Sequence, residues 1–254
     1  MTSDNLISII MPSYNTAEYI ADSIRSVINQ TYSSWELIIV DDCSTDDTIG
    51  IVKQFDDARI ILIQNEINSG AAVSRNRALR EANGRWIAFL DSDDIWEPEK
   101  LEKQLRFMKE NNYSFSFTDY RICLNGTWLP YINIGPDMVD RRMIYRYCYF
   151  STITVMYDKE VVGLIQAPDI RKNNDYAMWL LALEKTEAYR LPECLSYYIK
   201  HDDSITGGSK LNLIKWHYRL FRNAREESVP TAVRHTVGNL FFGTVKKLRY
   251  TEKI

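Results

Sequence analysis

The chain has 254 residues, a length that suits one large domain or one domain with a small appendage. Its composition, 45% hydrophobic and 26% charged, is that of an ordinary globular protein. No apolar run approaches the roughly 18 residues that a membrane-spanning helix needs, and MTSDNLISII lacks the basic start of a signal peptide. Four cysteines, none at metal or redox spacing, predict free thiols in a reducing compartment. We therefore expect a cytoplasmic protein.

Strands and helices alternate through the first 111 residues. Strands are predicted over 6–11, 35–40, 59–64 and 85–90, and helices over 17–30, 49–55, 71–82 and 98–111. This alternation predicts an α/β fold with a mixed, mainly parallel sheet flanked by helices. The less regular remainder predicts strands over 114–122, 150–157 and 194–199, a helix over 175–184, and C-terminal helices over 210–227 and 231–249 separated at Val229-Pro230.

Polar residues follow the predicted strands at the point where each strand ends. They are Pro12 to Asn15 after the first strand, Asp41-Asp42 after the second, and Asp91-Ser92-Asp93-Asp94 after the fourth. Ligands of open α/β sheets bind at the edge where the carboxyl ends of parallel strands lie. Carboxylates this close repel one another unless a cation lies among them, and oxygen ligands suit Mg²⁺ or Mn²⁺. The alternative is that Asp91 or Asp94 caps the next turn or helix.

Five segments, in order, resemble family 2 glycosyltransferases of the GT-A fold. They are SIIMPSYN (8–15), QTYSSWELIIVDDCSTDDT (30–48), NSGAAVSRNRAL (68–79), FLDSDD (89–94) and NNDYAMWLLAL (173–183). The resemblance implies a GT-A catalytic domain over 1–208, with a nucleotide- and metal-binding half (1–111) and an acceptor half (112–208), followed by a helical segment (209–254). It also implies a sugar-nucleotide donor, Mn²⁺ or Mg²⁺ as cofactor, and inversion at the anomeric carbon.

The resemblance also implies roles in nucleotide binding. Pro12 and Tyr14 resemble the turn that holds the base and ribose, and Asp42 resembles the aspartate that accepts a hydrogen bond from uracil N3–H. Arg75 would meet the nucleotide, the alternative being an exposed helix arginine. Ser92 is expected at the nucleotide as well.

The metal site is expected in the same aspartate loop. Asp93 is the expected direct ligand, and Asp91 is expected to contact the ribose or the metal. Asp94 is expected to support the site, as a further ligand or a contact of the donor sugar. His201 resembles a family histidine near the diphosphate that can bind the metal, the alternative being an ordinary surface histidine.

Inversion by direct displacement needs a base that takes the proton of the acceptor hydroxyl. Asp175 matches the position of this base in the family, although Asn173-Asn174-Asp175 is also a natural helix N-cap sequence. Two positions depart from the family pattern. Asn174 stands where the family commonly has Glu, and Ile199 stands where it often has Arg.

The C-terminal segment is basic in an otherwise acidic chain. From Lys210 to the end the chain has ten Lys and Arg and three Glu, a net charge of +7, whereas the residues before Lys210 have a net charge of −10. Aromatic and aliphatic residues interleave with these charges, so the predicted helices 210–254 would either lie on anionic lipid or pack on the catalytic domain. The acidic body and the absence of a nucleic-acid motif argue against nucleic acid as a partner.

The leading interpretation is an inverting glycosyltransferase that moves a hexose or N-acetylhexosamine from a UDP-sugar to a surface-polysaccharide acceptor. We expect the acceptor to be linked to undecaprenyl diphosphate, and the enzyme to act at the inner face of the cell membrane. The alternatives are a catalytically impaired sugar-nucleotide-binding homologue and a nucleotidyltransferase. Against the latter, PSYNT after the first strand is not a glycine-rich phosphate loop.

Overall fold

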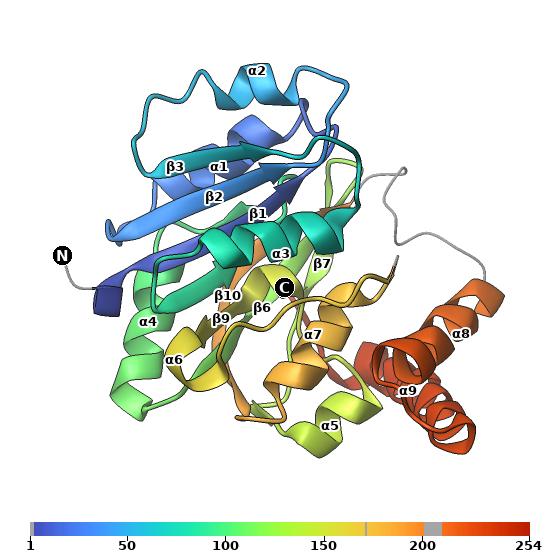
Figure 1. Cartoon of the computed structure of the whole chain (residues 1–254). Coiled ribbons are helices and arrows are strands. Elements are labelled where there is room, and N and C mark those ends of the chain that lie inside the picture. The colour runs from blue at the N-terminus through green and yellow to red at the C-terminus, as the bar shows by residue number, and fades with distance from the viewer. Residues whose placement is uncertain (1–2, 171, 201–209) are drawn as a thin grey trace.

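The structure is a computed structural model that describes residues 3–170, 172–200 and 210–254 (Figure 1). Within these residues, eleven strands form one mixed sheet with helices on both faces. This arrangement confirms the predicted α/β class. No helix in the described part of the chain combines the length and apolar character needed to cross a membrane.

The N-terminal half of the sheet is parallel, in the order β4–β1–β2–β3. These strands are β1 (Ile7–Ser13), β2 (Trp35–Asp41), β3 (Ile60–Gln64) and β4 (Trp86–Phe89). Every residue of β1, β2 and β4 is buried, which explains why the sequence shows them as continuous apolar runs.

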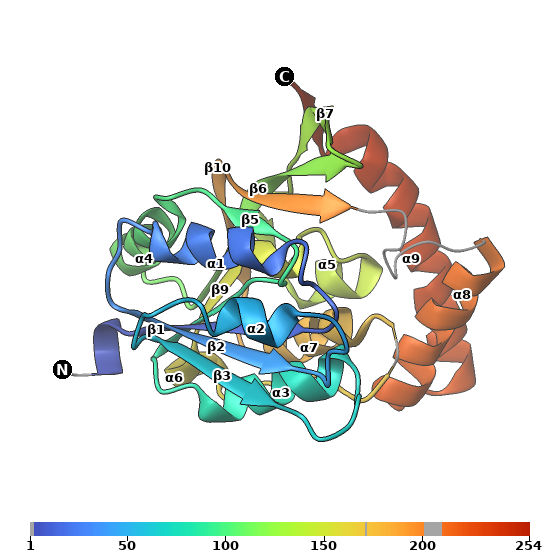
Figure 2. The same cartoon turned by 90° about the horizontal axis from the view of Figure 1, so that it is seen from above.

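Helices cover both faces of this half (Figure 2). On one face α1 (Ile20–Ile28) and α4 (Lys100–Asn111) bury their apolar sides against β1 and β2. On the other face lie α3 (Ala71–Glu81) and α7 (Asn174–Ala182). The short helix α2 (Thr48–Val52) follows the turn after β2. Helix boundaries in this half differ from the predicted ones by three residues or fewer.

The C-terminal half of the sheet is joined to the first by β9, which runs antiparallel between β4 and β6. Strand β10 runs parallel to β6 and also pairs with β5 and β8. The bounds are β5 (Ile95–Trp96), β6 (Phe115–Leu124), β7 (Thr127–Asn133), β8 (Met138–Val139), β9 (Val155–Asp158), β10 (Ala188–Lys200) and β11 (Thr251–Lys253). The remaining helices of the body are α5 (Arg141–Arg146), α6 (Lys159–Val162) and the 3₁₀ turns Ser3–Asn5 and Thr152–Thr154.

The strand predicted over 150–157 is wrong in its first half. Residues Thr152–Thr154 form a 3₁₀ turn, and the strand begins at Val155. The hydroxyl and the amide of Thr154 both donate to the carbonyl of Ser151, at 2.6 and 3.0 Å. A threonine side chain thus stabilises a turn in a segment whose residue types favour a strand.

The C-terminal segment folds as α8 (Lys210–Arg219), a π-helical stretch (Leu220–Ala224) and α9 (Val229–Arg249). Pro230 does not separate two helices as predicted, because it lies in the first turn of α9, where a proline is tolerated. Strand β11 then pairs with β7.

This segment packs on the body of the protein. Leu220, Phe221 and Ala232 are fully buried in the same apolar cluster as α7. Packing on the catalytic domain, one of the two alternatives for this segment, is therefore present. The other side of α9 stays exposed, with Val237 at 61% and Phe241 at 64%.

Candidate active site

The turns after β1 and β2 are hydrogen-bonded to each other. The Asp42 amide donates to the Ser13 carbonyl at 2.8 Å, and the Asn15 amide donates to Ser44 Oγ at 2.9 Å. Pro12 is buried within β1, whereas Tyr14 is 47% exposed at the turn. The pairing of two parallel strands therefore holds one exposed aromatic ring at the carboxyl edge of the sheet.

The Asp42 carboxylate is buried and holds the loop that precedes α3. Its Oδ1 accepts from Asn65 Nδ2 (2.7 Å) and the Ser69 amide (2.9 Å), and its Oδ2 accepts from the Gly70 amide (2.6 Å). Burial would raise the pKa of Asp42, but these hydrogen bonds outweigh it and hold the pKa below its ordinary value. An ionised carboxylate has about four lone-pair positions, so Oδ2 retains one for a ligand N–H.

The loop between β4 and β5 carries the aspartates. Burial, followed by the charge of Asp91, raises the pKa of Asp93 to about 7. Asp94 is fully buried, and burial followed by repulsion from Asp93 and Asp91 raises its pKa well above the ordinary value. Its Oδ1 accepts from the Ile199 amide at 2.7 Å, which ties the loop to β10. Ser92 is buried between these aspartates.

Arg75 joins this loop to the start of α7. Its Nη2 donates to Asp91 Oδ1 at 3.1 Å, and its Nη1 donates to Asn174 Oδ1 at 2.9 Å. The residue is 5% exposed, so the alternative of an exposed helix arginine is wrong. Because the two contacts come from one rigid guanidinium, they fix the aspartate loop relative to α7.

Asp175 is half-buried in the first turn of α7. Its Oδ2 accepts from Thr152 Oγ1 at 3.0 Å, and its Oδ1 accepts from the Tyr176 amide at 2.8 Å. The N-cap of α7 is Asn173, so Asp175 is not the cap that the sequence allowed as an alternative. Its carboxylate is instead oriented by a hydroxyl on the turn before β9.

The expected metal-ligand set is not gathered as predicted. In residues 3–170, 172–200 and 210–254, no three His, Cys, Asp or Glu side chains are arranged to hold a metal ion. The reason lies in the contacts of two expected ligands, because Asp91 pairs with Arg75 and Asp94 binds the Ile199 amide. His201, the remaining expected ligand, lies outside the described residues.

The chemistry of the aspartate loop nevertheless suits a divalent cation. Asp94 Oδ2 is buried without a hydrogen-bond partner among the described residues. Burial, and after it repulsion from neighbouring aspartates of the loop, raises the pKa values of the Asp93 and Asp94 carboxyls. A hard cation would relieve that repulsion and satisfy the buried oxygen.

Comparison with known proteins decides the family. Residues 8–165 match the family model "Glycosyl transferase family 2". The chain belongs to this family. A relative from Bacillus subtilis (strain 168), TuaG, is named as a teichuronic acid biosynthesis glycosyltransferase and is 46% identical over 79% of this chain and 81% of its own.

Two further comparisons extend over most of this family 2 glycosyltransferase. WfaP of Escherichia coli, named a UDP-Glc:α-D-GlcNAc-diphosphoundecaprenol β-1,3-glucosyltransferase, is 36% identical over 96% of this chain and 94% of its own. The crystal structure of S. aureus TarS 1–349 with UDP-GlcNAc superposes with a TM-score of 0.72 at 23% identity, covering 91% of this chain and 71% of the TarS 1–349 chain. The last comparison supports the GT-A fold, and the family assignment confirms the expectation of a glycosyltransferase over a nucleotidyltransferase.

Sequence reasoning missed the contacts of two residues of the candidate site. The sequence marks Asn174 only as a departure from the family pattern, whereas in the structure its Oδ1 accepts a hydrogen bond from Arg75. Thr152 orients Asp175 from a segment that was predicted to be a strand. No sequence signal identifies Thr152, because its contact with Asp175 depends on how β9 and α7 pack.

Proposed function

We propose that this enzyme moves a hexose or N-acetylhexosamine, with inversion, from a UDP-sugar to a surface-polysaccharide acceptor linked to a lipid diphosphate. The observation that carries the proposal is Arg75, which connects the aspartate loop to the helix that bears Asp175. One buried side chain thus joins the donor and acceptor parts of a single site. The name of the relative WfaP, which specifies a UDP-sugar donor and a diphosphoundecaprenol-linked acceptor, supports the substrate classes.

The proposed reaction is a direct displacement at the anomeric carbon. Asp175 takes the proton of the acceptor hydroxyl. The oxygen of that hydroxyl bonds to the anomeric carbon, while the bond between this carbon and the UDP oxygen breaks on the opposite face. The hydrogen bond from Thr152 to Oδ2 and the one from the Tyr176 amide to Oδ1 hold the carboxylate of Asp175 in place for this transfer.

The donor is proposed to lie along the carboxyl edge of the sheet. Tyr14 would stack on the uracil beside Pro12, Asp42 would accept from N3–H through Oδ2, and Arg75 with Ser92 would lie at the nucleotide. Asp93 and Asp91 would hold Mn²⁺ or Mg²⁺, with Asp94 supporting the loop. When bound, the cation neutralises charge that develops on the leaving diphosphate. The proposed role of His201 at the diphosphate falls on a residue outside the described range.

The C-terminal segment supports a position at the inner face of the membrane. Val229, Val233, Val237 and Phe241 follow one another at four-residue spacing along α9 and are each 46% exposed or more. Basic residues flank this apolar stripe, and such a face binds anionic lipid. We therefore propose a cytoplasmic enzyme that is peripheral to the membrane.

A nucleotide panel tests the donor class. The melting temperature of the full chain is measured with UDP, GDP, CDP and ADP, each with and without Mn²⁺. Manganese-dependent stabilisation by UDP alone is the expected result. Stabilisation by GDP instead would indicate a GDP-sugar donor on the same fold, and no response to any of the four nucleotides would contradict the proposed donor site.

A further inference from the structure

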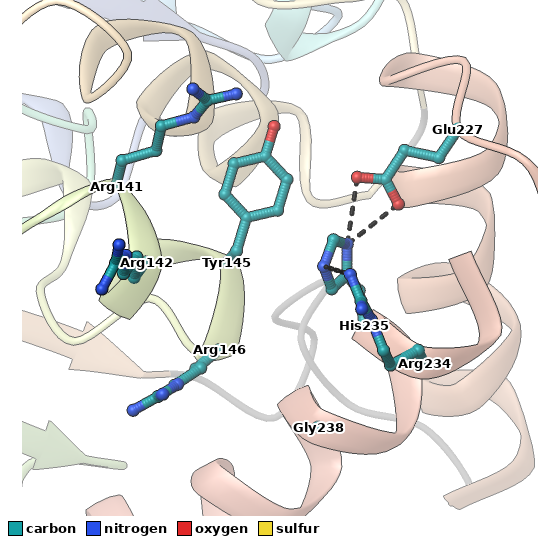
Figure 3. A pocket seen from close by; sticks show the side chains of 8 residues that line it. All are labelled: Arg141, Arg142, Tyr145, Arg146, Glu227, Arg234, His235 and Gly238. Carbon is teal, nitrogen blue, oxygen red and sulfur yellow. Dashed lines mark hydrogen bonds and ion pairs between the residues drawn. The ribbon is translucent and has the colours of Figure 1, made fainter. Parts of the chain in front are cut away.

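A cavity of about 630 Å³ lies between α5 and α9 (Figure 3). Arg141, Arg142 and Arg146 of α5 line one wall, and Arg234 of α9 lines the other. The volume is in the range of small-molecule sites, and no residue of the candidate active site lines it. The cavity is therefore a second place where a ligand fits.

The charge of this pocket is unbalanced. Glu227 is the single carboxylate that lines it, and both Glu227 oxygens contact His235 Nδ1, at 3.0 and 2.9 Å. Within the described residues no ion pair joins any of the four arginines to a carboxylate. Guanidinium groups without a counter-charge bind phosphate oxygens, which they match in both charge and geometry.

Both walls of the pocket are bonded to the residue that follows Asp175. The buried Tyr176 hydroxyl donates to the Ile144 carbonyl of α5 at 2.6 Å and accepts from Asn239 Nδ2 of α9 at 2.7 Å. Ile144 lies between the pocket arginines of α5, and Asn239 follows Gly238, which also lines the pocket. The two helices that carry the arginines are therefore tied to the helix of the proposed base.

Exposed apolar residues of α9 lie close in sequence to the pocket-lining Gly238. Val237 precedes Gly238 and is 61% exposed, and Phe241 lies one turn further along at 64%. A ligand with phosphate in the pocket and a hydrocarbon chain outside it would meet apolar surface. This combination of charge and apolar surface fits a phosphorylated lipid better than a free nucleotide.

We propose that the α5–α9 pocket binds the diphosphate of the lipid-linked acceptor. The inference rests on the proposed function, because it names the site for one part of that acceptor. A diphosphate carries enough charge to engage several arginines at once. A diphosphate bound in this pocket would hold the acceptor sugar on the side of α7 and the lipid chain on the exposed apolar stripe of α9.

The direct test uses inorganic pyrophosphate and the full chain in buffer free of divalent cations. Binding by calorimetry is compared for the wild type, for Arg141→Gln/Arg142→Gln, and for the matched control Arg80→Gln/Arg106→Gln, whose arginines are exposed on α3 and α4. We expect the pocket variant to lose about tenfold or more in affinity and the control to keep it. Equal affinity of all three proteins, or no binding by the wild type, would overturn the proposal.

Vesicles separate an acceptor diphosphate from bulk phospholipid. Binding of the same pocket variant to vesicles of phosphatidylcholine with phosphatidylglycerol is measured. If the variant no longer binds these vesicles but keeps its affinity for pyrophosphate, the pocket is a phospholipid headgroup site and the proposal is wrong. We expect the opposite, because the exposed stripe of α9 and its flanking Lys246 and Lys247 remain in the variant.

Kinetics tests the site during transfer. With an N-acetylglucosamine diphospho-lipid as acceptor, the pocket variant should raise the acceptor KM by about tenfold or more, with kcat and the UDP-sugar KM unchanged. With an alkyl glycoside of the same sugar, which lacks the diphosphate, the variant should match the wild type, and an equal rise for both acceptors would contradict the inference. Manganese-dependent UDP binding, measured on the same proteins, tests the proposed function separately, so that the two failures are distinguishable.

Discussion

Arg75 donates from Nη2 to Asp91 Oδ1 at 3.1 Å, and this ion pair is the point at which α3 meets the aspartate loop. The Arg75 side chain is 6% exposed and that of Asp91 is 34% exposed. Arg75 is therefore a buried positive charge paired with one carboxylate of the aspartate loop. Its second contact, with Asn174, extends this relationship to the helix of the proposed base.

Arg75→Met should make the protein depend on a cation for stability. Removal of the guanidinium leaves the Asp91 carboxylate without its ion-pair partner, at a cost of roughly 2 kcal/mol once solvent screening of Asp91 is allowed for. We expect a lower melting temperature without metal and a larger stabilisation by MnCl₂ than in the wild type. Arg80→Met, on the exposed side of the same helix, is the control. Equal responses of Arg75→Met and the wild type to MnCl₂ would contradict this account.

Asp175→Asn should abolish most transfer while it leaves donor binding intact. The variant keeps the shape of the side chain but cannot take a proton, and general-base catalysis contributes about 10²- to 10⁴-fold. The measurement is kcat together with the dissociation constant for UDP and Mn²⁺. Transfer at the wild-type rate would show that another group is the base.

Thr152 offers a graded version of the same test. Thr152→Val removes the hydrogen bond to Asp175 Oδ2 with little change in volume, and Thr152→Ser restores a hydroxyl. We expect kcat to fall by about tenfold in the valine variant and to recover in the serine variant. A fall of equal size in both variants would indicate a packing effect and not the orientation of Asp175.

The sequence predicted the N-terminal half of the fold well, because its strands are buried on both faces and its helices have a clear apolar side. The carboxyl-edge placement of Asp42 and Asp91 follows from that pattern alone. The second half was predicted less well. Strand β7 lies near an edge of the sheet, its residues are exposed or partly exposed and include Pro130, and α5 is a helix of six residues, so neither has a strong periodic signal.

The candidate site was predicted in its residues but not in its connections. Arg75 and Asp175 were named from motifs far apart in the chain, but their link through Asn174 depends on how α3 packs against α7. The pocket between α5 and α9 was not predicted at all. Its arginines come from two segments that sequence spacing does not relate, and they come together only through tertiary packing.

Asp93→Asn should separate stability from function. Burial and then the charge of Asp91 raise the pKa of Asp93 to about 7. Above that pH the carboxyl is ionised in the folded protein as well, and this lowers the free energy of unfolding because the unfolded chain ionises the same group at its ordinary, lower pKa. We expect the neutral variant to melt at a higher temperature at about pH 8 in the absence of metal, and to lose manganese-dependent binding of UDP. Asp56→Asn, an exposed aspartate elsewhere, controls for the change in net charge. UDP affinity that still responds to Mn²⁺ would remove Asp93 from the metal site.

The protein should lose stability in mild acid because the pKa of the buried His217 is lowered. Burial lowers the pKa of His217 on α8 to about 4, below the value of about 6.5 for an unfolded chain. Between these values the unfolded chain binds a proton that the folded chain does not, so the free energy of unfolding falls as the pH drops. The loss is at most about 1.4 kcal/mol per pH unit. Urea unfolding of His217→Phe should show a smaller loss over this range, and parallel pH curves for the two proteins would contradict the assignment.

The most direct test of the central claim is the stereochemistry of the product. The enzyme is incubated with Mn²⁺, a panel of α-linked UDP-sugars and an N-acetylglucosamine diphospho-lipid, and the product is examined by mass spectrometry and NMR. The account predicts one added sugar in a β-linkage, release of UDP, and no product from the Asp175→Asn variant. An α-linked product, or no transfer from any UDP-sugar of the panel, would contradict it.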